Sequence, residues 1–231
     1  MGAVAENLTA VKERIAKAAA RMGRDPEAVT LVAVTKTVPV ERIREAIDAG
    51  HQVFGENRVQ EAQAKIQLLG RGDVQWHLIG HLQRNKVRFV CDLFDRIHSV
   101  DSFPLAQEID SRAARHGSVM PILVQVNIGD ESTKSGVPLA DTLALVKAVA
   151  KLPHVAIRGL MCIPPAVDVP EHARPYFIQL RTLAERIAQE QIPDVAMAEL
   201  SMGMSHDFEV AVEEGATMVR VGSAIFGPRP T

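Results

Sequence analysis

Long apolar runs are absent from this sequence of 231 residues. No window approaches the ~18 to 20 consecutive apolar residues that a membrane-spanning helix needs. The amphipathic N-terminus also lacks the apolar segment of a signal peptide. Extended basic runs are missing too, and the formal net charge is −2, which gives no electrostatic footprint for nucleic acid or an anionic membrane. We therefore expect a cytoplasmic protein whose partner is a small molecule.

Cysteine is scarce. The two cysteines, Cys91 and Cys162, lie in apolar surroundings without a CxxC pattern, so their spacing indicates reduced, buried thiols rather than a disulfide or a zinc site. Apolar residues make up 47% of the chain and charged residues 23%, a composition typical of a globular protein. The length suits one sizeable core, and we expect residues 1–231 to form a single domain.

What the sequence does contain is a regular alternation of short apolar segments with longer amphipathic ones. An amphipathic helix is expected over residues 3–22. The segment TLVAVTK that follows is short and β-branched, as a buried strand should be. In the next segment, Pro39 and Gly50 stand where a capped helix begins and ends. The alternation then recurs, and the expected strands are 30–36, 53–55, 76–80, 96–100, 121–128, 156–161, 198–202 and 217–222.

This alternation predicts the fold class. Strands that alternate with helices are joined by right-handed crossovers and form a parallel sheet covered by helices. Eight such units in about 200 residues favour an α/β fold of the TIM type, a closed (β/α)8 barrel, here with an extra N-terminal helix. The alternative is an open, doubly wound sheet, but its GxGxxG fingerprint is absent after the first strand.

The carboxyl ends of the strands are where a TIM barrel places its active site. Lys36 ends the first expected strand, which is otherwise apolar, so its amine is expected near the barrel mouth. A neutral lysine amine attacks aldehydes and suits a stable imine with a carbonyl cofactor. The alternative is a lysine that extends to solvent from the barrel rim.

Small residues follow the seventh and eighth expected strands, at Gly203, Ser205, Gly222 and Ser223. Glycine allows backbone to approach an anion closely. TIM barrels often bind phosphate with these two loops and a short extra helix, and residues 223–227 are placed to form that helix. The pattern therefore indicates a phosphate site, with ordinary turn glycines as the alternative.

Arg220 precedes Gly222 by two residues, and strand alternation leaves open whether it points into the barrel or toward the helices. If it points inward, it faces the ring of a cofactor whose phosphate lies at Gly222 and Ser223. A guanidinium donates hydrogen bonds and takes no proton, so it would keep a pyridine nitrogen unprotonated and weaken the ring as an electron sink. A salt-bridged arginine at the rim is the alternative.

Six stretches carry a resemblance to a known family: AVTKTVP, AIDAGHQVFGENRVQE, WHLIGHLQRNK, VNIGDESTKSG, RGLMCIPP and LSMGMSHDFEVAVEEGATMVRVGSAIFG. In this order they resemble the pyridoxal phosphate homeostasis family (YggS/PROSC type) over nearly the whole chain. The resemblance implies a barrel like the N-terminal domain of alanine racemase, with pyridoxal 5'-phosphate (PLP) held as a Schiff base on Lys36. It also implies the other cofactor-binding residues, which are Asn57 beside the cofactor, Ser205, Gly222 and Ser223 at the phosphate, Arg220 at the ring nitrogen, and Met161, Ser201 and Met204 along the pocket.

The resemblance implies a function as well. Members are regarded as cofactor carriers or homeostasis factors without established turnover, so no catalytic residue is expected. A reversible Schiff base on Lys36 would release PLP when another amine competes, and apo forms of PLP-dependent enzymes are candidate recipients. Family precedent implies a monomer. His81 departs from the pattern, because a proline or another small residue is expected there, and this concerns the shape of the third loop.

Three other functions are open to such a sequence. A PLP-dependent amino acid racemase or decarboxylase is the main one, but alanine racemase draws its second base from a tyrosine, and Tyr176 lies in an expected helix. A metal-dependent hydrolase is suggested by His77 and His81, but this pair spans a strand end and a loop with Gly80, so no metal site is expected. A plain interaction protein would leave the purified chain colourless, whereas a bound PLP imine is yellow.

Overall fold

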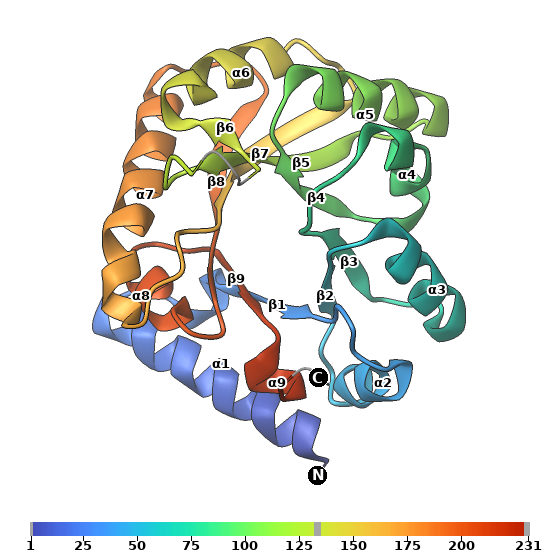
Figure 1. Ribbon diagram of the computed structural model, residues 1–231, viewed down its shortest axis with the longest axis vertical. Helices are drawn as coiled ribbons and strands as arrows, with labels where there is room; N and C mark the ends of the chain where they lie inside the picture. Colours follow the sequence, from blue (N-terminus) through green and yellow to red (C-terminus); the bar gives the residue numbers. More distant parts are fainter. Residues whose placement is uncertain (1, 132–134, 229–231) are drawn as a thin grey trace.

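Parallel strands close into a barrel in the computed structural model, which describes residues 2–131 and 135–228 (Figure 1). The strands are β1 Thr30–Val34, β2 Val53–Glu56, β3 Gln75–Leu78, β4 Arg96–Val100, β5 Met120–Asn127, β6 Val137–Pro138, β7 Val155–Cys162, β8 Val195–Met204 and β9 Met218–Val221. They lie in the order β4-β3-β2-β1-β9-β8-β7-β5-β6, and a further pairing of β4 with β5 closes the ring. β6 is a two-residue strand outside the ring. The predicted closed TIM-type barrel is confirmed, and the open-sheet alternative is wrong.

Helices surround the barrel on its outer side (Figure 1). The α-helices are α1 Ala3–Arg21, α2 Val40–Asp48, α3 Val59–Leu69, α4 Val90–Leu93, α5 Phe103–His116, α6 Thr142–Val149, α7 Arg174–Gln189, α8 Phe208–Glu213 and α9 Ser223–Phe226, and the 3-10 helices are η1 Pro26–Ala28, η2 Arg84–Phe89, η3 Leu139–Asp141 and η4 Pro170–Ala173. None of the helices in the described ranges is long and apolar enough to cross a membrane.

The expected N-terminal helix is α1, and it supports the last elements of the chain. It packs along α8 and α9 (Figure 1). Arg14 pairs with Glu209 of α8 at 2.9 Å, and the Asn7 side-chain amide donates to the carbonyl of Ile225 in α9 at 2.9 Å. α9 begins directly after the loop that follows β9. Through its contacts with α9, α1 therefore supports this loop from the outer side of the barrel.

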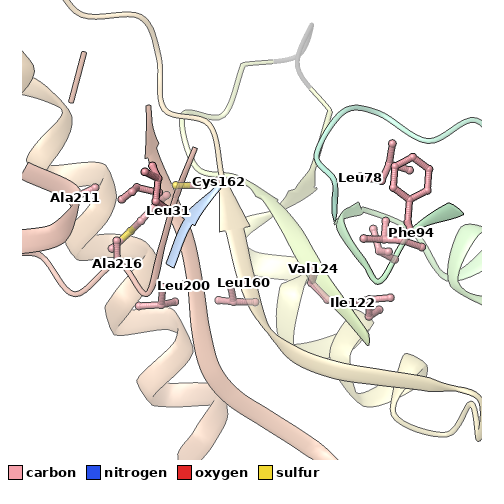
Figure 2. Close-up of a cluster of buried hydrophobic side chains, with 14 of the residues drawn as sticks. Leu31, Leu78, Phe94, Ile122, Val124, Leu160, Cys162, Leu200, Ala211 and Ala216 are labelled. Atoms are coloured by element: carbon pink, nitrogen blue, oxygen red, sulfur yellow. The ribbon is translucent and has the colours of Figure 1, made fainter. Parts of the chain in front are cut away.

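The core lies between strands and helices, and strand alternation decides which residues join it. Leu31 and Ala33 of β1 belong to this apolar layer, as do Val219 and Val221 of β9. Figure 2 shows part of the layer, with Leu31, Leu160 and Leu200 among the labelled side chains. Alternation therefore turns Arg220 away from the helices and into the barrel.

The segment after the third strand differs from its prediction. The alternation predicts a helix after the third strand, but the segment that follows is mostly the 3-10 helix η2, with the single turn of α4 after it. Asn85 and the β-branched Val87 and Val90 have low helix propensity. Val87 and Val90 are nevertheless fully buried, so packing rather than local preference fixes this segment.

Candidate functional site

A cavity of about 470 Å³ opens at the carboxyl ends of β1, β2, β8 and β9. It is lined by seven of the predicted site residues, which are Lys36, Asn57, Met204, Ser205, Arg220, Gly222 and Ser223. A volume of this size suits a small-molecule ligand. The structure thus brings together, at one end of the barrel, residues that are up to 187 positions apart in the chain (from 36 to 223).

Lys36 lies two residues after the end of β1, at the mouth of the barrel, and its side chain is half-buried on the cavity wall. The backbone around it is tightly defined. Thr37 has a positive φ of 62°, which is uncommon outside glycine, and its hydroxyl donates to the carbonyl of Lys36 at 2.6 Å. Hydrogen bonds hold Thr35 and Thr37, the two residues that flank Lys36. The lysine therefore lies on a fixed segment of backbone.

Asn57 follows β2 and lines the cavity, and its side-chain oxygen lacks a hydrogen-bond partner in the part of the chain that the structure describes. Its Oδ1 is buried and makes no hydrogen bond within the described residues. An unpaired buried amide oxygen is unfavourable unless a ligand donates to it. Gly80 fixes the position of this residue, because a Cβ there would lie 2.3 Å from the carbonyl oxygen of Asn57. The β3 loop can therefore pack this closely only with glycine.

The opposite wall of the cavity carries small polar residues suited to an anion. The Gly222 N–H donates to the Ser205 hydroxyl at 3.1 Å, and Ser223 begins α9 beside it. A Cβ on Gly222 would lie 3.3 Å from the carbonyl oxygen of Val34, so a larger residue would crowd the end of β1. Hydroxyls and backbone N–H groups at this wall are the donors that phosphate oxygens accept from.

Gly203 has a different role from the one its spacing suggested. It does not line the cavity. Its φ is +89°, and a Cβ there would lie 2.5 Å from the Cβ of Ala211. Glycine is thus required at this position by the close packing of α8 against the end of β8.

Arg220 points into the barrel and is 4% exposed. Its Nη1 donates to the Ser201 hydroxyl at 2.6 Å, and its Nη2 donates to the carbonyl of Cys162 at 2.8 Å. Burial lowers the pKa of Arg220 from its usual value, although a guanidinium stays charged at neutral pH. A fixed cation therefore forms the inner end of the cavity, and neither of these two hydrogen bonds is to a carboxylate.

A buried polar chain continues from Arg220 across the barrel interior. The Ser201 Oγ lies 2.9 Å from the Nδ1 of His98, and the His98 Nε2 lies 3.0 Å from the Nδ1 of His77. Burial lowers the pKa of His77 to about 3 and lowers that of His98 well below its usual value, so both rings are neutral. Sequence reasoning missed this series of hydrogen bonds. Its only signal in the sequence is one histidine within each of the two expected strands, 76–80 and 96–100.

Two predicted site residues, Met161 and Ser201, do not line the cavity. Both are fully buried, and they pair with each other in register between β7 and β8. Ser201 still acts on the site, because it accepts the hydrogen bond that orients Arg220. Met161 packs in the barrel interior behind the cavity wall.

The histidines once considered as a metal pair lie in different settings. His77 is engaged with His98 in the barrel interior, whereas the side chain of His81 is 56% exposed and lies 3.8 Å from the Asp101 carboxylate. The residue that departs from the family pattern, His81, is thus outside the cavity lining.

Comparisons with known proteins agree on what this chain is similar to. The family model of the alanine racemase N-terminal domain matches residues 7–230. A pyridoxal phosphate homeostasis protein of Aquifex aeolicus is 47% identical over 224 residues, which cover 97% of each chain. The structure of PipY of Synechococcus elongatus PCC7942 with PLP bound is 41% identical, with a TM-score of 0.85, and covers 97% of this chain and 100% of that one.

A more distant structure supports the fold alone. Alanine racemase of Corynebacterium glutamicum is 18% identical with a TM-score of 0.70, and the match covers 99% of this chain but 62% of that one. The barrel is thus the shared part. The family match over nearly the whole length, together with the relative at 47% identity, shows that this chain belongs to the alanine racemase N-terminal domain family and, within it, to the pyridoxal phosphate homeostasis proteins.

Proposed function

We propose that this chain binds PLP in the cavity at the barrel mouth and acts in PLP homeostasis, holding the cofactor as a reversible Schiff base on Lys36. The observation that carries the proposal is the convergence of Lys36, the Ser205 and Gly222 wall, and Arg220 on one cavity. The name of the Aquifex relative and the PLP-bound PipY structure support it.

The anchoring chemistry belongs to Lys36. PLP supplies an aldehyde, a phosphate and a pyridine ring when bound. The Lys36 amine, in its unprotonated form, would attack the aldehyde carbon, and loss of one water would leave a C=N bond to Nζ. The reaction reverses when water or a competing amine attacks the same carbon, so the lysine can both hold and release the cofactor.

The other wall residues divide the remaining contacts. With PLP bound, the hydroxyls of Ser205 and Ser223 and the backbone of Gly222 would hold the phosphate, and Asn57, whose Oδ1 has no partner within the described residues, would lie beside the cofactor. Arg220, at the inner end of the cavity, would donate to the ring nitrogen. Because a guanidinium gives up no proton at neutral pH, that nitrogen would stay unprotonated and the ring would be a weak electron sink.

This arrangement favours a carrier over an enzyme. A racemase needs an acid or base on each face of its substrate. Tyr176 lies on α7, outside the cavity lining. The cavity wall carries the imidazole of His206, and its Nε2 lies 3.2 Å from the carbonyl oxygen of Asp168. The alternative, a racemase or decarboxylase, predicts deuterium exchange at the α-carbon of amino acids or release of CO2, and a carrier predicts neither.

The proposed recipients of the cofactor are apo forms of PLP-dependent enzymes, and the proposed carrier acts as a monomer.

The first test is chemical trapping. The purified chain with PLP is expected to show the near-ultraviolet and visible absorbance of an imine, which borohydride removes because it reduces C=N to a stable secondary amine. Peptide mass mapping should then place the reduced adduct on Lys36. Absence of imine absorbance after added PLP, or an adduct only on other lysines, would contradict the proposal.

A further inference from the structure

Lys36 stands beside a buried ion cluster that the proposed function does not use. We call it the Lys65 cluster: Lys65 and Glu61 of α3, Glu56 of β2, and the Thr35 and Thr37 residues that flank Lys36. The Lys65 Nζ donates to the Glu56 carboxylate at 2.7 Å, to the Glu61 carboxylate at 2.6 Å and to the carbonyl oxygen of Thr35 at 2.6 Å. All three protons of the ammonium are thus used.

The cluster holds both neighbours of Lys36. On the N-terminal side, the Thr35 hydroxyl donates to Glu56 Oε1 at 2.6 Å, and its carbonyl accepts from Lys65. On the C-terminal side, the Thr37 N–H donates to Glu61 Oε1 at 2.6 Å. Lys65 binds both carboxylates, so one ammonium links the contacts that hold Thr35 to the contact that holds Thr37. We call these contacts around Lys36 the clamp.

Burial of these charged groups carries a desolvation penalty. The side chain of Lys65 is 8% exposed and that of Glu56 is fully buried. A buried ion pair seldom stabilises a fold more than apolar residues of similar size would. What the pair supplies here is geometry, because it fixes the one stretch of backbone that adopts a positive φ next to Lys36.

We propose that Lys65 is a positioning residue for Lys36: it holds Thr35 directly and Thr37 through Glu61, and so sets the direction of the Lys36 amine toward the cavity. This inference rests on the proposed Schiff base at Lys36. It assigns Lys65 no contact with the cofactor. Small errors in the placement of a reacting atom cost large factors in reactivity, so loosening this clamp impairs imine formation more than it impairs binding of the phosphate.

The test separates these two steps with two ligands. PLP reports imine formation by its absorbance, whereas pyridoxine 5'-phosphate carries an alcohol in place of the aldehyde and reports binding without the covalent bond. Lys65→Met is expected to lower the equilibrium constant of imine formation by roughly tenfold or more, while the Kd for pyridoxine 5'-phosphate changes by less than about threefold. The matched control is Lys147→Met, which removes an exposed ion pair with Glu190 and should change neither.

Further variants keep the test decisive if Lys65→Met does not fold. Glu56→Gln combined with Lys65→Met removes the buried charges together, which avoids a lone buried carboxylate. Glu61 is partly exposed, so its variants should fold: Glu61→Ala loses the acceptor for the Thr37 N–H and should weaken imine formation several-fold, whereas Glu61→Gln keeps an acceptor oxygen and should recover most of it.

Each outcome is informative. Imine formation that is unchanged in folded Lys65→Met, or in the double variant, and in Glu61→Ala would overturn the positioning role while leaving the proposed function intact. An equal loss of PLP and pyridoxine 5'-phosphate binding would overturn it too, because that pattern means a general loss of structure. Failure to trap an adduct on Lys36 in the unmodified chain would remove the proposed function, and this inference with it.

Discussion

Lys36→Ala is expected to abolish the imine absorbance of the chain with PLP and to prevent borohydride from trapping the cofactor. The lysine lies on the cavity wall two residues after the end of β1, and the C=N bond needs its Nζ. No other lysine lines the cavity formed by the described residues. Binding should persist, but more weakly, because Ser205, Gly222 and Ser223 remain in place for the phosphate.

The size of the loss separates the covalent anchor from the other contacts. Without the imine we expect the apparent affinity for PLP to fall by roughly a hundredfold, about 3 kcal/mol, whereas the affinity for pyridoxine 5'-phosphate should be nearly unchanged. Absorbance titration gives the first quantity, and competition or calorimetry gives the second. Lys12→Ala, at an exposed position on α1, is the matched control. Imine absorbance that persists at full strength in Lys36→Ala would refute the assignment.

Local patterns were enough to predict most of the fold. Strands such as Thr30–Val34 are short and β-branched, with helix starts and stops marked by residues such as Pro39 and Gly50. In a parallel barrel the strand ends converge, so Lys36, Ser205 and Gly222 could be placed at one site from their positions after strands alone. The short β6 was not predicted, because it is defined only by its pairing with β5.

Contacts made across the barrel could not be read from the sequence. His98 meets Ser201, which is 103 positions away, and His77, which is 21 positions away. Lys65 looks like one more polar residue of an amphipathic helix, yet it is buried against Glu56. Such pairings depend on register and on which face of a strand turns inward, and a single residue's sequence neighbours do not fix either.

Mild acid is expected to destabilise the protein strongly, because three histidines are buried in their neutral form. They are His51, His77 and His98, each at most 5% exposed. Burial lowers the pKa of His51 to about 4 and that of His77 to about 3, and it lowers that of His98 well below its usual value. In the unfolded chain each histidine titrates near pH 6.5. Below that pH the unfolded state therefore binds protons that the folded state does not bind.

The sign and size follow from linkage. Stability is lost wherever the unfolded state binds more protons as pH falls, which here begins below about pH 6.5. For a histidine with a folded pKa of about 4 or below, the free energy of unfolding should be lower by about 2 kcal/mol at pH 5 than at pH 8. His51 and His77 together should therefore cost about 4 kcal/mol over that interval, and the lowered pKa of His98 adds to the loss in the same direction; this is a large share of the stability of a typical domain.

Urea unfolding at pH 8, 6.5 and 5 measures this loss, and His51→Gln assigns part of it. The His51 Nε2 lies 2.8 Å from the carbonyl oxygen of Val53, a contact that a glutamine amide can replace without a titrating group. The variant should lose about 2 kcal/mol less than the unmodified chain between pH 8 and pH 5. His172→Gln, at an exposed position in η4, should leave the pH dependence unchanged. If His51→Gln and the unmodified chain lose stability equally over this range, His51 is not the neutral, buried group that its surroundings indicate, and the acid sensitivity would have to come from other groups.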